Sequence, residues 1–427
     1  MTARVSSLLD LVEPKTARIL HQSLEGEELS GPDLLTLFEA QGHELHALAM
    51  TADELRRRVV GEVVTYVVNR NISFTNVCVK RCDFCAFSRG WREEEGYYLP
   101  IEEIVRRTKE AAEFGATEVC VQAGLPPQMD GRLYVDICRA IKKEVPEIHI
   151  HGFSPEEVIY GSLRSGCSVA EYLAALKEAG LGSIPGTAAE ILVQKIRNSI
   201  SPGRITVERW IEVVTTAHQL GIPTTSTIMY GHLEKPAHWV QHLLLLRDIQ
   251  KQTGGFTEFV PLSFIYQETP VGRRSFFTEA SLGATADVVI KMHAVARLAF
   301  NGYIQHIQAS WVKEGPKFAQ YLLMAGCDDF GGTLMNEIIA ASAGATHGQM
   351  MRPIEIRRLI RASGRVPAQR STLYEIMRVF EDDGPAGALD LVEDPESTFG
   401  SYRGLVSSPS FKYEITSQAG RRAATGV

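Results

Sequence analysis

Three cysteines lie close together in the segment NVCVKRCDFCAF, at Cys78, Cys82 and Cys85. Thiolates bind soft metals, and a compact loop with this spacing can place three of them around one face of an iron-sulfur cluster. An electron-transfer [4Fe-4S] cluster normally has four cysteine ligands, so three cysteines leave one iron without a protein ligand. Structural zinc is the alternative, but zinc needs four ligands and the segment offers only three. The spacing therefore favours a [4Fe-4S] cluster with one open iron.

An open iron can chelate the amino and carboxylate groups of S-adenosylmethionine (SAM), as in radical SAM enzymes. The predicted cofactors are therefore a [4Fe-4S] cluster and SAM. The chain has seven cysteines, an odd number at low density, which argues against a disulfide framework. The other four lie in apolar segments or at turns and are interpreted as buried thiols: Cys120, Cys138, Cys167 and Cys327.

The sequence from about residue 67 to 345 alternates short β-rich runs with amphipathic helices. This alternation indicates parallel strands joined by crossover helices. The candidate strands number eight, at 71–75, 117–122, 147–153, 181–185, 222–230, 256–262, 303–310 and near 327–330. Helices are expected at 101–114, 131–144, 168–179, 206–219, 236–252, 284–299 and 315–325. We predict an α/β fold, a TIM-type (β/α)8 radical SAM barrel with additions at both ends.

The chain divides into four expected parts. Apolar residues recur at helical spacing in residues 1–66, which predicts an N-terminal helical segment, and the barrel follows at 67–345. Residues 346–384 are expected to be a C-terminal helical segment that packs on the barrel. Residues 385–427 are rich in Gly, Pro, Ser and acidic side chains, which predicts a loosely structured extension.

Active-site residues of such barrels gather at the C-terminal ends of the strands. Gln122 and Gly124 follow the second strand, where a small residue lets the main chain approach SAM; an ordinary strand-to-helix turn is the alternative. Glu190 follows the fourth strand and is a candidate for a ligand ammonium or ribose, although a helix dipole also stabilises a carboxylate there. Phe84, inside the cysteine loop, is also assigned to cofactor binding.

The third and fifth strands end with residues suited to proton transfer or to orienting a substrate. These candidates are His151, Tyr230 and His232. Each histidine is equally compatible with an ordinary hydrogen-bonded position in the barrel mouth.

Charge and hydropathy narrow the range of partners. The net charge is −7, and the 44 Lys and Arg residues are scattered along the chain, so no basic patch indicates nucleic acid. No apolar run reaches the roughly 18 residues that a membrane span needs. We expect a cytoplasmic protein that binds small molecules, with no nucleic-acid or membrane partner.

The cysteine loop, GSIPGTAAEIL (182–192) and TSTIMYGHLE (225–234) together resemble the family of radical SAM enzymes that make the deazaflavin chromophore FO and, in sister branches, futalosine-derived menaquinone. Similar segments span about 64 to 348. One departure is the tripeptide at 122–124, Gln-Ala-Gly, where the family usually has Gln-Gly-Gly. The extra methyl slightly tightens the SAM pocket and leaves main-chain contact feasible.

The resemblance implies a function in FO biosynthesis. A 5′-deoxyadenosyl radical from SAM would take a hydrogen atom from the amino group of L-tyrosine, whose Cα–Cβ bond then breaks. The 4-hydroxybenzyl group would add to 5-amino-6-(D-ribitylamino)uracil, with release of 2-iminoacetate, methionine and 5′-deoxyadenosine. The resemblance also implies an electron donor and a second, CofG-like FO synthase subunit. The alternative is a menaquinone-branch enzyme, either aminofutalosine synthase or dehypoxanthine futalosine cyclase.

Overall fold

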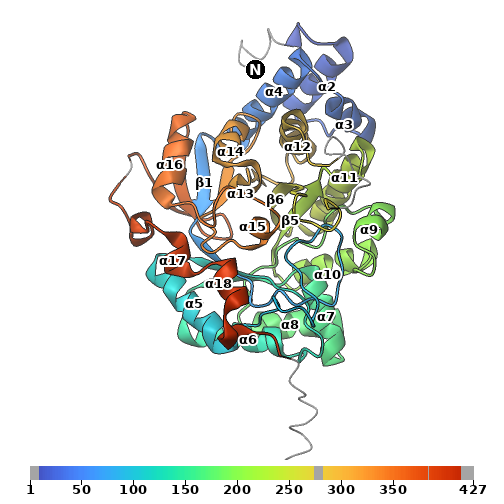
Figure 1. Ribbon diagram of the computed structural model, residues 1–427. Coiled ribbons are helices and arrows are strands. Elements are labelled where there is room, and N and C mark those ends of the chain that lie inside the picture. Colours follow the sequence, from blue (N-terminus) through green and yellow to red (C-terminus); the bar gives the residue numbers. More distant parts are fainter. Residues whose placement is uncertain (1–8, 274–281, 383, 415–427) are drawn as a thin grey trace, which may run out of the picture.

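The computed structural model describes residues 9–273, 282–382 and 384–414. Parallel strands occupy the middle of the molecule, and helices surround them (Figure 1). Within the described residues the ring runs from β1 and β2 through β3, β4, residues 183–184, β5, β6 and β7 to β8, which pairs with β1. The ring is therefore closed, and the predicted (β/α)8 barrel is confirmed.

The observed strands agree with most of the predicted ranges. Two predicted strands are reduced, because 181–185 contributes only isolated bridges at Ser183 and Ile184 and the seventh strand is two residues long. The ring strands are β1 (Val63–Val67), β2 (Asn69–Ile72), β3 (Glu118–Val121), β4 (His149–Gly152), β5 (Thr224–Tyr230), β6 (Phe256–Ser263), β7 (His306–Ile307) and β8 (Asp329–Gly332).

Helices cover the outside of the ring. Those that match predicted ranges are α5 (Ile101–Glu113), α6 (Leu133–Glu144), α8 (Val169–Glu178), α10 (Val207–Gln219), α11 (Pro236–Thr253), α12 (Ala286–Ala299) and α14 (Pro316–Leu322). Those that were not predicted are α7 (Pro155–Ser165), α9 (Gln194–Ile200), α13 (Trp311–Glu314) and α15 (Ile339–Ser342).

The helix α7 was missed because a glycine interrupts its apolar pattern. A Cβ at Gly161 would lie 2.3 Å from the hydroxyl of Tyr172 on α8, so this glycine lets the two helices pack closely. The start of α7 carries a clear signal, since Ser154 and Glu157 form a capping box.

Three helices precede the barrel, as expected: α2 (Pro14–Leu24), α3 (Gly31–Phe38) and α4 (His43–Val60). They form the upper part of the molecule in Figure 1 and contact α11 and α12. The helix α4 ends at Gly61, whose φ of 71° suits glycine. The β-branched run that follows begins β1 at Val63, so the first strand starts earlier than predicted and crosses the expected boundary at residue 66.

Residues 346–384 are only partly helical. They contain α16 (Pro353–Ala362), but also β9 (Val366–Arg370) and β10 (Ile376–Val379). β9 pairs in parallel with β1, and β10 pairs with β9 in antiparallel fashion. β1 can accept β9 because it is β2, and not β1, that pairs with β3.

Residues 385–414 pack on the barrel, in contrast to the loose extension expected there. They form η2 (Ala388–Leu391), α17 (Pro395–Phe399), α18 (Tyr402–Ser407) and η3 (Pro409–Phe411). Phe399 is buried, with its ring 5.1 Å from that of Phe114. Widely spaced apolar residues anchor a polar segment, and composition alone therefore failed to reveal its packing. Residues 415–427 lie outside the described residues.

The turn between β9 and β10 closes the N-terminal end of the barrel. Arg370 donates to both carboxylate oxygens of Asp329, at 2.6 and 3.1 Å. Tyr374 donates to Glu258 Oε2 at 2.6 Å, and its ring stacks 3.7 Å from that of His306. Ligands must therefore enter the barrel from its opposite, C-terminal end.

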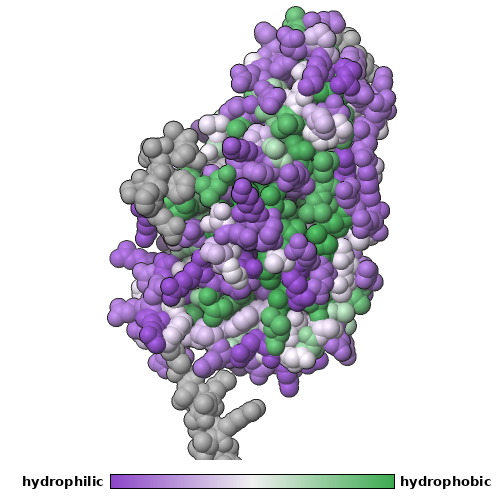
Figure 2. All heavy atoms as spheres, turned by 90° about the vertical axis from the view of Figure 1, so that its right-hand side faces the viewer, coloured by the Kyte–Doolittle hydropathy of each residue, from purple (hydrophilic) through white to green (hydrophobic). Residues whose placement is uncertain are grey.

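The face of the molecule shown in Figure 2 is mainly hydrophilic. In Figure 2, hydrophilic side chains cover most of the visible face, including the N-terminal helices at the top, and apolar side chains form a band in the middle. Among the described residues, no helix combines the length and the apolar character that crossing a membrane requires.

Candidate active site

The cysteine loop follows β2 at the C-terminal end of the barrel. Main-chain hydrogen bonds fix it on several sides: Val79 N–H donates to the Leu125 carbonyl at 2.8 Å, and Asp83 N–H donates to the Ile200 carbonyl at 3.0 Å. The Cys78 N–H also donates to a carbonyl, that of Arg89, at 3.0 Å. These main-chain hydrogen bonds hold the loop in place.

The three thiols lie in a poorly solvated environment. Cys82 is buried, whereas Cys78 and Cys85 are half-buried. Burial raises the pKa of the Cys78 thiol, and it raises that of Cys82 to about 12, because a thiolate loses solvation there. A bound metal would supply the positive charge that stabilises these thiolates. No group of three His, Cys, Asp or Glu side chains in the described residues is placed to hold a single metal ion.

A charged network lies next to Cys82, centred on Arg204. The Arg204 guanidinium is 3.9 Å from Cys82 Sγ and donates to Glu190 Oε1 at 2.5 Å and to Glu156 Oε2 at 3.1 Å. Phe84 lies under the guanidinium, with 5.7 Å between its ring centre and Arg204 Cζ. Glu190 is therefore brought to the cysteine loop, which itself carries Phe84, and Arg204 contacts both residues.

Gly124 packs directly on the loop. Its N–H donates to the Thr75 carbonyl at 2.9 Å, and a Cβ built on it would lie only 2.4 Å from the Val77 carbonyl oxygen. Only glycine fits between these two backbones. Gln122 lies nearby, and its Oε1 accepts a hydrogen bond from the Thr187 hydroxyl at 2.7 Å. Both residues therefore lie at the barrel mouth, as predicted.

The main chain between Gln122 and Gly124 is held by Glu157, which sequence reasoning missed. Its Oε1 accepts from the Ala123 N–H at 3.0 Å, and its Oε2 accepts from both the N–H and the hydroxyl of Ser154 at 2.6 Å. Burial raises the pKa of Glu157 to about 7, even though these donors favour the carboxylate. The capping-box pattern Ser-Pro-Glu-Glu was the available signal.

Both predicted histidines make hydrogen bonds within the protein. His151 lies inside the barrel, its Nδ1 is 2.7 Å from Ser183 Oγ, and burial lowers its pKa to about 4, so the ring is neutral near pH 7. The Leu233 N–H donates to His232 Nδ1 at 2.8 Å, and His232 Nε2 lies 3.0 Å from the Met229 carbonyl. The protein therefore occupies both ring nitrogens of His232.

The structure places His232 near the loop and Tyr230 away from it. His232 and Phe84 line the same cavity of about 70 Å³. Tyr230 is fully buried, and its ring packs edge-on against Trp239 of α11 at 6.4 Å. Side chains alternate along a strand, so Tyr230 points toward the helix layer while Met229 takes the other face. This position gives Tyr230 a packing role.

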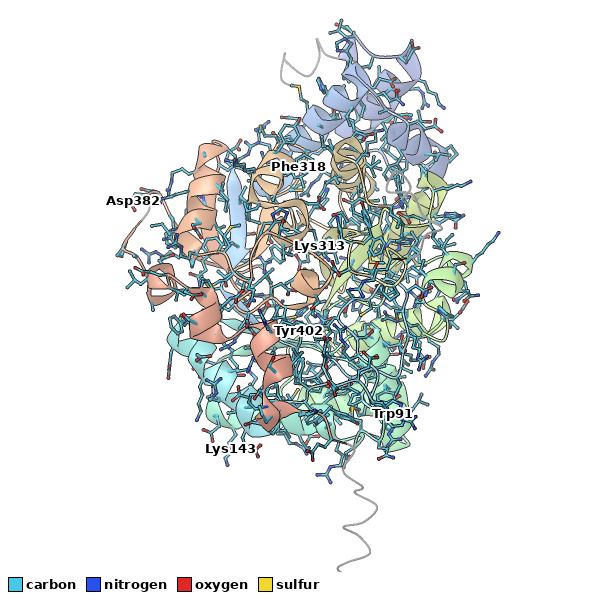
Figure 3. All side chains as sticks on the ribbon, viewed as in Figure 1. Trp91, Lys143, Lys313, Phe318, Asp382 and Tyr402 are labelled. Carbon is cyan, nitrogen blue, oxygen red and sulfur yellow. The ribbon has the colours of Figure 1, made fainter. Side chains whose placement is uncertain are left out.

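The C-terminal residues cover the cysteine loop, which no sequence pattern indicated. Tyr402 of α18, labelled in Figure 3, accepts a hydrogen bond from the Asn76 side chain at 3.3 Å. Its ring also lies 6.1 Å from that of Phe87. Residues near position 400 therefore support the segment that carries the cysteines.

A three-cysteine loop at the C-terminal end of a closed parallel barrel defines the radical SAM class. Residues 72–246 match the family model of the radical SAM superfamily, and residues 253–382 match that of the CofH/MqnC C-terminal region. The crystal structure of methylornithine synthase (PylB) has a TM-score of 0.65 and 20% identity, covering 82% of this chain and 97% of that one. That similarity concerns the fold alone.

Two curated relatives indicate to which family of radical SAM enzymes the chain belongs. The chain is 47% identical over 363 residues to the 5-amino-6-(D-ribitylamino)uracil--L-tyrosine 4-hydroxyphenyl transferase of Methanothermobacter thermautotrophicus, covering 85% of this chain and 98% of that protein. It is 46% identical over 345 residues to the FO synthase of Mycobacterium tuberculosis, covering 81% of this chain and 40% of that protein. The chain belongs to the CofH family of radical SAM enzymes. Membership implies a [4Fe-4S] cluster and SAM.

Proposed function

We propose that this chain transfers the 4-hydroxybenzyl group of L-tyrosine to 5-amino-6-(D-ribitylamino)uracil in FO biosynthesis. The observation that carries the proposal is the extent of the match, since 98% of the length of a relative named for this transfer aligns with a chain that retains the three-cysteine loop. The menaquinone-branch alternative has no comparable support, because the curated relatives described above carry transferase or FO synthase names.

Different residues around the loop would have different roles. Cys78, Cys82 and Cys85 would hold the cluster, which together with SAM supplies reductive cleavage of SAM and a carbon-centred radical. The buried and half-buried thiols and the adjacent Arg204 fit an anionic thiolate-bound group. Gly124 offers the main chain at close range.

The remaining predicted residues would shape the SAM side of the pocket. Glu190 and Phe84 contact Arg204, and Gln122 is oriented by Thr187. His232 would hold the turn beside Phe84, and His151 would act as a neutral hydrogen-bonding group inside the barrel. Packing around these groups would exclude water, which protects a radical from side reactions.

Completion of FO would need partners. The chain aligns with 40% of the longer FO synthase of Mycobacterium tuberculosis, which supports a separate CofG-like subunit for the remaining chemistry. A one-electron donor is also required, and we propose that all of these components meet in the cytoplasm.

Anaerobic reconstitution tests the proposal. The protein is loaded with iron and sulfide, then reduced with SAM, L-tyrosine and 5-amino-6-(D-ribitylamino)uracil present, and products are identified by mass. We expect 5′-deoxyadenosine and a 4-hydroxybenzyl adduct of the uracil. Deoxyadenosine without this adduct would contradict the substrate assignment, and absence of deoxyadenosine would contradict the enzyme class.

A further inference from the structure

Lys313 lies in α13, directly after β7 at the C-terminal end of the barrel. Figure 3 labels it near the middle of the view. Burial lowers the pKa of its ammonium group, and within the described residues no hydrogen bond or ion pair is formed by its Nζ. Lys313 is half-buried, and an ammonium group at a barrel mouth that has no protein partner is available to a negatively charged ligand.

The nearest acidic groups leave this charge without a close counter-ion. Glu337 exerts the largest attraction on Lys313, followed by Glu314, but neither comes within the 4.0 Å of an ion pair. Burial raises the pKa of Glu314, which weakens it as an anion. Lys313 and Glu337 thus follow β7 and β8, two neighbouring strands of the ring, at the same end of the barrel without forming an ion pair.

Glu337 is rigidly held. It is 6% exposed; its Oε1 accepts from the Ala340 N–H at 2.7 Å, and its Oε2 accepts from the Asn71 side chain. A carboxylate has about four acceptor positions, so these two bonds leave room for a ligand ammonium. Asn71 belongs to β2, which leads directly into the cysteine loop.

We propose that Lys313 and Glu337 together bind the carboxylate and the amino group of an α-amino acid. In the proposed function this amino acid is L-tyrosine, so the inference rests on that function and specifies how the substrate is held. The uracil substrate has no carboxylate. SAM has the same two groups, but Gln122 and Glu157 follow β3 and β4, and Arg204 follows α9. Lys313 and Glu337 instead follow β7 and β8, on the other side of the loop.

Equilibrium binding to the reconstituted, SAM-loaded protein provides the test. Three probes are compared: L-tyrosine, tyramine, which lacks the carboxylate, and 3-(4-hydroxyphenyl)propionate, which lacks the amino group. The variants are Lys313→Met and Glu337→Gln, with Lys313→Arg as the charge-preserving change. Lys317→Met serves as the matched control, since Lys317 is exposed at the start of α14.

We expect Lys313→Met to weaken L-tyrosine binding about 10- to 100-fold, the usual loss for a hydrogen bond to a charged group, and to leave tyramine unaffected. Glu337→Gln should weaken L-tyrosine and tyramine but not the propionate. Lys313→Arg should retain part of the affinity, and Lys317→Met all of it. SAM affinity should be the same in every variant.

Three results would overturn the inference. Wild-type protein that binds all three probes equally has no such pair, whatever the variants do. A loss of SAM affinity in Lys313→Met would assign the lysine to SAM. Unchanged L-tyrosine binding in this variant, while wild type still forms the hydroxybenzyl adduct, would remove the inference and leave the proposed function intact.

Discussion

Replacement of Gly124 by alanine tests how tightly the barrel mouth holds the cysteine loop. The new Cβ would lie 2.4 Å from the Val77 carbonyl oxygen and 2.9 Å from its carbon. Both atoms are backbone, directly before Cys78, so they cannot turn aside as a flexible side chain would. Relief therefore requires the loop itself to move.

Overpacking of this kind costs about 1–3 kcal/mol. Because about 1.4 kcal/mol is a factor of ten in an equilibrium, the cluster-binding arrangement of the loop should become about 5- to 150-fold less favoured. We expect Gly124→Ala protein to bind less iron and sulfide after reconstitution and to form 5′-deoxyadenosine more slowly.

The assay compares wild type with Gly124→Ala. Iron content and visible absorbance are measured after reconstitution, and thermal unfolding is measured on the unreconstituted protein. Gly387→Ala is the matched control, since Gly387 is exposed and its new Cβ would meet only Asp390, at 3.8 Å. If Gly124→Ala were to load as much cluster as wild type with an unchanged unfolding temperature, the close-contact argument would be refuted.

Further changes test other parts of the site and barrel. Cys82→Ala should abolish cluster binding and SAM cleavage together, as iron content and deoxyadenosine yield will show. Burial raises the pKa of Glu157 from 4.5 to about 7. The protonated Glu157 therefore contributes fully to the stability of the fold below pH 4.5, and this contribution is lost as the pH rises to 7. Urea unfolding should therefore show wild type losing about 3 kcal/mol relative to Glu157→Gln between pH 4.5 and 8; parallel pH profiles would contradict this. Tyr374→Phe removes the hydrogen bond to buried Glu258 and should lower the unfolding free energy by about 1–3 kcal/mol in the same assay.

The three proposed cluster ligands could be picked out from the sequence because they lie within eight consecutive residues. The spacing of the cysteines along the chain is therefore enough to identify them as candidate ligands, and the fold determines only where the loop lies. Gly124 was predictable for a related reason, since a glycine after a barrel strand marks a close backbone approach. The barrel itself followed from alternation of strand and helix patterns.

Other parts of the site depend on contacts between distant segments. Arg204 meets Glu156 across 48 positions, and it lies in an irregular segment after α9 where no periodicity marks it. Tyr230 is a predicted catalytic residue because it lies at a strand end. The direction of its side chain depends on the two-residue alternation along the strand, which points it toward α11. Tyr402 reaches the loop from a segment whose composition indicated loose structure.

Arg204 and Lys313 differ in one respect that bears on substrate recognition. Arg204 already has two carboxylate partners inside the protein, so a ligand that binds it must compete with existing ion pairs. Lys313 has no close partner among the described residues, so a ligand carboxylate would be its first. A ligand carboxylate therefore offsets more of the desolvation cost at Lys313 than it would at Arg204. Arg204 is better suited to keeping the surroundings of Cys82 positive. On this reasoning, charged side chains recognise the amino-acid substrate on the β7–β8 side of the loop. Shape and main-chain contacts dominate the recognition of SAM on the other side, after β3 and β4.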